Sequence, residues 1–105
     1  MNGSTELLIV LPSELPDNVI GYSRTPEFTE DTLPEALKAA HTTKRGVWGL
    51  IHVLDGQLFY CLEPPHKGQR LIYAGETAPI PPGIPHRVAF VKNGRFFVEF
   101  FKKPP

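Results

Sequence analysis

The stretch from Gly75 to His86 constrains the fold of this chain more than any other part of the sequence. Five residues separate Gly75 from Pro81, and one residue separates Pro81 from Gly83. Two more residues separate Gly83 from His86. Gly75 permits a positive φ angle, and the prolines together with Gly83 preset a tight bend. The bend delivers His86 to the start of an apolar strand, residues 87–91. The spacing therefore predicts a β-domain in which a rigid bend fixes the position of one histidine at the start of a strand.

The composition is that of one small domain with many turns. The chain has 105 residues, enough for a single hydrophobic core, and we expect one domain over residues 1–105. Its 12 prolines and 9 glycines divide it into short segments, which is typical of an all-β domain. Basic and acidic residues number 11 each, and this balance argues against a main role in binding nucleic acid or an anionic membrane.

Two features bear on the compartment in which the protein works. Cys61 is the single cysteine, so no intrachain disulfide can form, which is typical of a reducing compartment. The apolar run at residues 7–11 is too short to cross a membrane and follows no basic segment, so we interpret residues 6–11 as a strand and not as a signal peptide. We therefore expect a cytoplasmic protein.

The clearest secondary-structure pattern is a pair of predicted hairpins. Residues 47–54 and 57–62 are rich in β-formers and flank an Asp-Gly dipeptide, which is a strong turn signal. Residues 86–91 and 96–101 flank an Asn-Gly dipeptide in the same way. Together these segments predict a compact antiparallel barrel or sandwich.

Shorter segments complete the predicted sheet. Strands are expected at residues 19–22 and 71–73. Residues 33–41 are rich in alanine, leucine, lysine and glutamate, which favour a helix, but a barrel needs a strand here. We interpret residues 33–41 as extended.

Glu99 is a carboxylate inside an otherwise apolar segment, residues 96–101. A strand that is apolar on both faces is usually buried on both, and a buried carboxylate needs a cation or a proton as compensation. Pairing around the Asn-Gly turn would place Glu99 next to the strand of His86, with both side chains facing the interior. A metal ion is one compensating cation, and an ion pair with Arg24 or Arg87 is the alternative.

Two histidines and this carboxylate form a candidate metal site. His41 precedes the first predicted hairpin, and His86 starts the second. Two imidazoles and a carboxylate suit a first-row divalent ion such as Zn, Fe, Mn or Ni, and three protein ligands leave positions for water or substrate. The alternative for His86 is that it only caps a turn. The metal interpretation assigns His41, His86 and Glu99 as ligands.

The remaining polar candidates have weaker patterns. His52 lies in the middle of a strand and is a ligand, a substrate-binding group or a hydrogen-bonded core residue. Cys61 is either a small buried hydrophobe or a cavity-facing thiol that binds a soft metal or reacts with an oxyanion. His66 lies in a loop with prolines and a glycine, where we expect it to be solvated.

Several blocks of the sequence agree in order and spacing with a known family. The blocks are residues 22–30, 41–49, 53–56, 85–86 and 95–100. They resemble the tellurite-resistance-related family of small TehB/YeaR-like cupins, and the spacing of the Gly75–His86 stretch is similar to the second cupin signature. The resemblance covers about residues 22–101. It implies a cupin-type antiparallel β-barrel, a double-stranded β-helix or jelly roll, with an interior metal site.

The resemblance also implies roles for individual residues. The characteristic histidines of the family fall on His41 and His86, and its acidic residue falls on Glu99. Arg24 lies in the Arg-Thr-Pro block and is a candidate for binding an anion or fixing the N-terminal segment. The first cupin signature is incomplete, because Thr43 stands where its second histidine would be.

Some relatives of this kind carry a methyltransferase that depends on S-adenosylmethionine after the barrel. This chain has no glycine-rich strand-to-helix loop for such a cofactor, so methyltransferase activity is not transferred to it. Three functions remain. The first is a metal-binding cupin that holds a polar or anionic small molecule, linked to oxyanion or nitrosative stress. The second is an Fe(II) oxygenase, and the third is a non-catalytic sensor or interaction module.

One face of the last strand bears on possible partners. Phe96, Val98 and Phe100 alternate along it. They would either dock a partner, such as the second copy in a homodimer, or form the inner face of the sheet.

Overall fold

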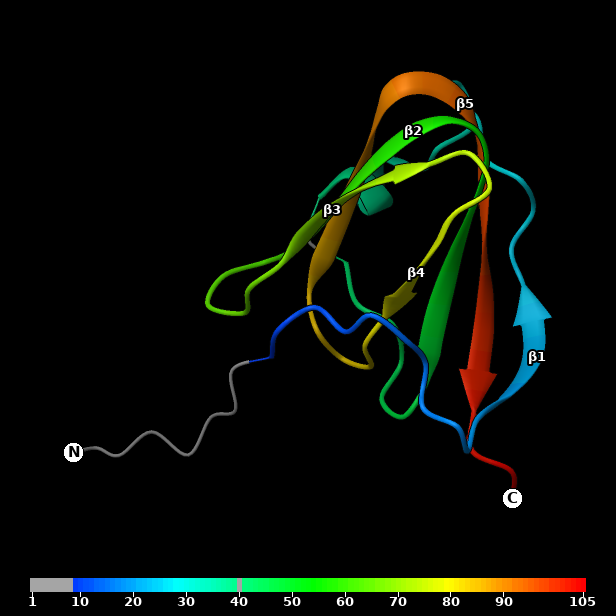
Figure 1. The fold of residues 1–105 in the computed structure, drawn as a ribbon, viewed down its shortest axis with the longest axis vertical. Helices are drawn as coiled ribbons and strands as arrows, with labels where there is room; N and C mark the ends of the chain where they lie inside the picture. Colours follow the sequence, from blue (N-terminus) through cyan, green and yellow to red (C-terminus); the bar gives the residue numbers. More distant parts are fainter. Residues whose placement is uncertain (1–8, 40) are drawn as a thin grey trace.

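The computed structural model describes residues 9–39 and 41–105. Its elements in chain order are β1 (Ile20–Arg24), the 3-10 helix η1 (Glu35–Lys38), β2 (Trp48–Leu62), β3 (Gln69–Tyr73), β4 (Thr77–Ile80) and β5 (His86–Lys102). The strands form one antiparallel sheet in the order β1-β5-β2-β3, and β4 pairs with β2. The sheet folds over on itself, so that strands face each other across an apolar interior (Figure 1). No helix of the described residues is long and apolar enough to cross a membrane.

The two long strands, β2 and β5, determine this architecture. They pair antiparallel along their whole length, from Trp48 opposite Phe101 to Leu62 opposite His86. The register shifts repeatedly between residues 53 and 58, and both strands bend over at this level (Figure 1). Bulges bend a strand and increase its twist. The first half of β2 therefore lies in one layer with β4 and the end of β5, and its second half lies in the other layer with β3 and the start of β5.

The predicted tight turns at the Asp-Gly and Asn-Gly dipeptides are wrong, because both dipeptides lie inside the bends of the long strands. Gly56 has a φ of +78°, and a Cβ atom there would lie against the backbone carbonyls of Lys92 and Asn93. A Cβ atom on Gly94 would similarly lie against the carbonyl of Asp55. The glycines are needed for the close approach of two backbones at the corner of the sheet. The two halves of β5 consequently pair with β2 and not with each other.

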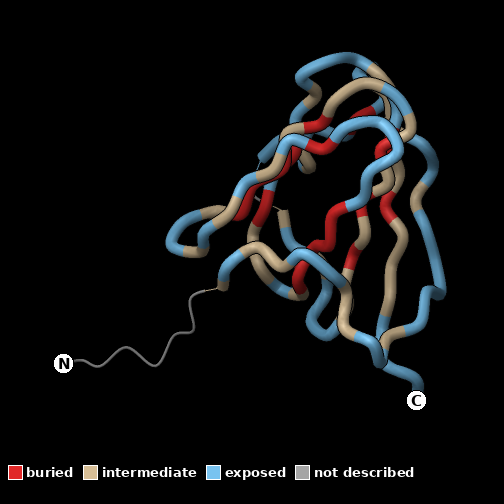
Figure 2. The backbone as a smooth tube through the Cα atoms, in the orientation of Figure 1, coloured by how far each residue is buried: buried red, intermediate tan, exposed pale blue. Residues whose placement is uncertain are grey.

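The buried residues form one hydrophobic cluster, and Figure 2 shows their positions along the backbone in red. Alternate residues of the bent strands point inward, including Ile51 and Tyr60 of β2, both fully buried. Phe96 and Val98 of β5 are buried as well, and Phe100 packs against the same cluster. Of the two alternatives for this face of β5, the inner sheet face is confirmed, and docking of a partner there is wrong.

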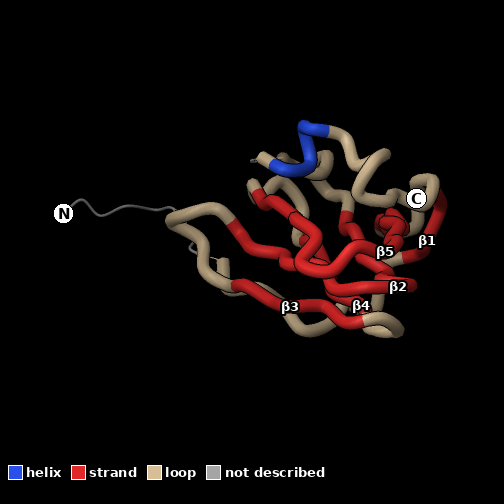
Figure 3. The backbone as a smooth tube through the Cα atoms, turned by 90° about the horizontal axis from the view of Figure 1, so that it is seen from above, coloured by secondary structure: helices blue, strands red, loops and turns tan. Residues whose placement is uncertain are grey.

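The shorter segments match the predictions in part. The strand expected at residues 19–22 is present as β1, and the one at 71–73 as β3. The extended interpretation of residues 33–41 is wrong at its centre, because η1 follows Pro34 and lies beside β5, on the side away from β3 and β4 (Figure 3). The strand β4 was not predicted, because proline lacks a backbone N–H and Pro79 with its neighbouring prolines is not typical of a strand.

The N-terminal strand predicted at residues 6–11 falls mostly outside the described residues. Within the described part, Val10 forms an isolated parallel bridge with Lys67.

Candidate functional site at the mouth of the barrel

His41 and His86 lie side by side. Each donates its backbone N–H to the carbonyl of the other at 2.8 Å, which makes a two-residue antiparallel bridge. Their rings meet edge to face, with centroids 5.7 Å apart. The tight bend predicted from the Gly75–His86 stretch produces this arrangement, since β5 begins at His86. The structure thus brings together two of the three residues of the predicted metal site.

The His86 imidazole is buried and chemically constrained. It is 4% exposed, and the ring of Tyr60 meets it edge-on at 5.9 Å. Burial lowers the pKa of His86, because the cation loses its hydration, and this outweighs the opposite effect of the Ile84 carbonyl. Nδ1 lies 3.1 Å from that carbonyl, which can only accept, so Nδ1 carries the proton. In the neutral ring Nε2 therefore keeps a lone pair and is available as a ligand.

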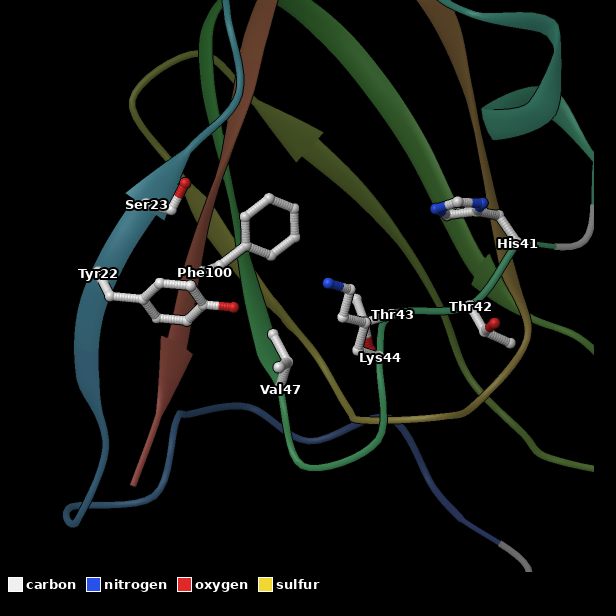
Figure 4. Close-up of a pocket in the computed structure, with 8 residues that line it drawn as sticks. All are labelled: Tyr22, Ser23, His41, Thr42, Thr43, Lys44, Val47 and Phe100. Atoms are coloured by element: carbon white, nitrogen blue, oxygen red, sulfur yellow. The ribbon is translucent and has the colours of Figure 1, made fainter. Parts of the chain in front are cut away.

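A hollow of about 430 Å³ opens beside His41. Its lining combines one imidazole, one ammonium group and several hydroxyls with an apolar wall: Tyr22, Ser23, His41, Thr42, Thr43, Lys44, Val47 and Phe100 (Figure 4). Two other hollows among the described residues, of about 340 and 390 Å³, contain no histidine. A volume of this size is typical of small-molecule sites.

Lys44 enters the hollow from the turn that precedes β2. The backbone N–H of Val47 donates to the carbonyl of Lys44 at 3.0 Å, and Gly46 closes the turn with a φ of +77°. The ammonium group points from this turn into the hollow, toward Phe100 (Figure 4). No carboxylate of the described chain lines the hollow, so its polar groups are cationic or neutral. The sequence interpretation missed Lys44, because a lysine in a turn is usually solvated.

Glu99 lies on the other face of the sheet. Its neighbours in the strand, Val98 and Phe100, point into the core, so Glu99 points outward by alternation. Its Oε1 atom lies 3.1 Å from Nε2 of His52. The prediction that Glu99 shares the interior with His86 is therefore wrong. The predicted ion pair of Glu99 with Arg24 or Arg87 is also not found, since Arg87 pairs with Glu63.

Arg24 and His52 belong to this outer face as well. The ring of Phe97 lies between them: His52 stacks on it with centroids 4.5 Å apart, and the Arg24 guanidinium lies 4.3 Å from its centroid. These residues come from three neighbouring strands, β1, β5 and β2. The structure does not bring Arg24 or His52 to the hollow, so their predicted part in ligand binding has no support from this geometry.

Cys61 and His66 complete the predicted set. Cys61 is buried, and strand alternation places it on the face of β2 opposite Tyr60. This is the small buried hydrophobe of the two alternatives. His66 is not simply solvated, because its Nδ1 accepts a hydrogen bond from the backbone N–H of Ile9 at 3.0 Å.

The donor set for a metal is small. Over residues 9–39 and 41–105, no group of three or more histidine, cysteine, aspartate or glutamate side chains could hold a metal ion. The His41–His86 pair alone brings two imidazoles together. It fits part of the coordination shell of a first-row ion, and the described protein residues do not complete it.

An antiparallel sheet folded into two layers, with a histidine pair and a hollow at one end, defines a small cupin-like β-barrel. Residues 23–98 match the TehB-like domain family, which is most of the chain. The chain belongs to the TehB-like domain family.

Two solved structures are similar over most of this chain. A protein from Escherichia coli K12 has a TM-score of 0.79 and 26% sequence identity, and the match covers 88% of this chain and 98% of that one. TehB from Haemophilus influenzae has a TM-score of 0.74 and 25% identity, and the match covers 83% of this chain but 32% of TehB.

Sequence comparison finds the same relative. The probable S-adenosyl-L-methionine-dependent methyltransferase TehB from Haemophilus influenzae is 42% identical over 45 residues. These residues are 42% of this chain and 16% of the relative. The chain therefore corresponds to a minor part of that protein, and the likeness concerns the barrel.

Proposed function

We propose that this domain binds a small anionic molecule in the hollow at the mouth of its barrel. The single observation that carries the proposal is the convergence of His41, Lys44 and several hydroxyl groups on one hollow of about 430 Å³. These polar groups come from β1 and from residues 41–44, and β5 adds the apolar Phe100, so the fold and not a single motif assembles the hollow. Convergent polar groups in an otherwise apolar concavity are the usual mark of a ligand site.

The metal part of the proposal uses the His41–His86 pair. Both imidazoles would serve as ligands to a first-row divalent ion such as Zn, Fe, Mn or Ni, with the other positions left to water and to the bound anion. A bound ion would supply a Lewis acid beside the hollow. The lowered pKa of His86 supports this role, because only the neutral imidazole can bind a metal.

The biological setting is proposed from the family. The resemblance to tellurite-resistance-related cupins suggests that the domain works under oxyanion or nitrosative stress. TehB is named as a probable methyltransferase, but the sequence match covers 16% of that protein, so this activity does not extend to the present chain.

Two measurements test the proposal. Elemental analysis of the purified protein should find about one first-row metal per chain, largely lost in His86→Ala and retained in the matched control His52→Ala. Anion titrations followed by ¹H–¹⁵N NMR should shift the amide signals of residues 41–47. A protein that takes up none of the four metals contradicts the metal part. Amide signals that no anion moves contradict the ligand site.

A further inference from the structure

We propose that the ligand of the hollow is an organic carboxylate with a flat apolar part, and not an inorganic oxyanion. This inference rests on the proposed function, because it assumes that the hollow is a ligand site. It concerns the division of the hollow into a cationic side and an apolar side, which together select one class of anion.

The cationic side is the turn at residues 41–47. Lys44 provides the ammonium group, and within the described residues it takes part in no ion pair. His41, whose ring forms another part of the wall, is half-buried. No carboxylate of the described chain lies in the lining to neutralise the Lys44 ammonium group. An anion placed here would accept a charge-assisted hydrogen bond, which is stronger than a neutral one.

The apolar side faces Lys44. Phe100 and Tyr22 present their rings to the hollow, and Val47 lines it below them (Figure 4). The Lys102 ammonium lies 4.4 Å from the centroid of the Tyr22 ring, so a cation–π contact supports that ring from outside the hollow's lining. An inorganic oxyanion would leave this wall facing water, whereas a flat apolar group would cover it.

The small number of strong donors supports the same conclusion. Inorganic oxyanions are usually held by several charged or backbone donors. Among the residues that line the hollow, Lys44 is the charged donor, and the other polar groups are the His41 imidazole and hydroxyls. Among these, the Thr43 hydroxyl already points to the Pro81 carbonyl at 3.5 Å. One carboxylate matches this set better than a compact anion with three or four oxygens.

The experiment compares three probes by NMR titration of the full chain. Benzoate combines a carboxylate with a ring, benzyl alcohol keeps the ring without the charge, and tellurite is an inorganic oxyanion. We expect benzoate to bind at least about tenfold more tightly than either of the others, because only benzoate uses both sides of the hollow. Its shifts should centre on Tyr22, Lys44 and Val47.

Variants locate the effect. Lys44→Gln should weaken benzoate about tenfold, and the matched control Arg45→Gln, which removes the neighbouring cation of the same turn, should change it less than about twofold. Tyr22→Ser should weaken benzoate more than tellurite, because it removes the ring and keeps a hydroxyl. Lys44, Arg45 and Tyr22 are all exposed, so these variants should fold.

The outcomes separate the two proposals. Equal binding of benzoate and benzyl alcohol, tighter binding of tellurite, or an unchanged affinity in Lys44→Gln would overturn the carboxylate inference while the hollow remained a ligand site. If none of the probes shifts the amides of residues 41–47, this inference fails. The proposed ligand site also fails only if none of the other anions tested shifts these amide signals.

Discussion

The Nε2 atom of His52 and the Oε1 atom of Glu99 lie 3.1 Å apart on the outer face of the sheet. Leu50, not His52, is the direct cross-strand partner of Glu99, so the contact is diagonal between two neighbouring strands. Gly21 of β1 leaves room for the Glu99 side chain, since a Cβ atom on Gly21 would lie 2.8 Å from Oε2 of Glu99. The acidic residue of the last strand is thus engaged with an outer histidine, while His41 and His86 lie at the mouth of the barrel.

This separation gives the first prediction. Glu99→Gln should leave the metal content of the purified protein unchanged, because Glu99 and the His41–His86 pair lie on opposite faces of β5. His41→Ala should lower the metal content strongly. Elemental analysis of both variants, prepared in parallel, measures the effect. A loss of metal in Glu99→Gln equal to that in His41→Ala would show that the carboxylate is a ligand after all.

The second prediction concerns the response of stability to acid. The pKa of His86 in the folded protein lies below its ordinary value of 6.5, so the unfolded chain binds the proton more readily. The free energy of unfolding should therefore fall as the pH drops below about 6.5 and through the lower folded pKa. Urea unfolding of the chelator-treated protein between about pH 7 and 5 measures this slope.

The variant His86→Gln removes this contribution to the slope. His52→Gln is the control, since it removes a half-exposed histidine on the outer face. We expect the acid-dependent loss of stability to be smaller in His86→Gln and preserved in His52→Gln. Parallel slopes in wild type and His86→Gln would mean that the burial of this imidazole does not control the acid response.

The third prediction concerns Tyr60. Its hydroxyl donates to the carbonyl of Pro79 at 2.9 Å and is fully buried, which ties β2 to β4 in the core. Tyr60→Phe leaves that carbonyl without this partner and should cost about 1–3 kcal/mol in the free energy of unfolding. Chemical denaturation of the two proteins at neutral pH measures the loss. A cost near zero would mean that the carbonyl finds another donor.

Tyr60 should also be visible in an alkaline titration. Burial raises the pKa of Tyr60 well above the ordinary value of 10.0. Because the unfolded phenol ionises near pH 10, the stability that burial gives the protonated form is present below that pH and is lost as the pH rises toward the folded pKa. Of the 3 tyrosines, we expect one to stay protonated above pH 10 in near-ultraviolet absorbance until the protein unfolds.

The local features of the fold were more predictable than the pairing of its strands. The Gly75–His86 stretch predicts a bend that presents a histidine, and the structure has Gly75 and Gly83 at φ of +88° and +67° with β5 starting at His86. These angles depend only on nearby residues. The side to which Glu99 points was not predictable in this way, because residues 96–101 are apolar on both sides of Glu99 and their pattern does not show which face of the strand is buried.

The candidate site was predictable to a similar extent. His41 and His86 were recognised from the motif and the family blocks, and the structure brings them together. Lys44 and Tyr22 were not, because each becomes part of a site only through the tertiary fold. A lysine in a turn and a tyrosine beside a proline segment look like ordinary surface residues until β1 and the turn at residues 41–47 face each other across the hollow.

The last prediction concerns the corner at which the long strands bend. Gly56 and Gly46 have nearly equal φ angles of +78° and +77°, but a Cβ atom on Gly46 would meet nothing within 4 Å, whereas one on Gly56 would meet the carbonyls of Lys92 and Asn93. Gly46→Ala should therefore cost only the backbone strain, about 1–2 kcal/mol. Gly56→Ala should cost at least about 2 kcal/mol more, because β2 and β5 must move apart. Chemical denaturation of both variants gives the difference. Equal costs would mean that the two strands are not closely packed at this corner, and that the bend rather than the contact determines the need for glycine.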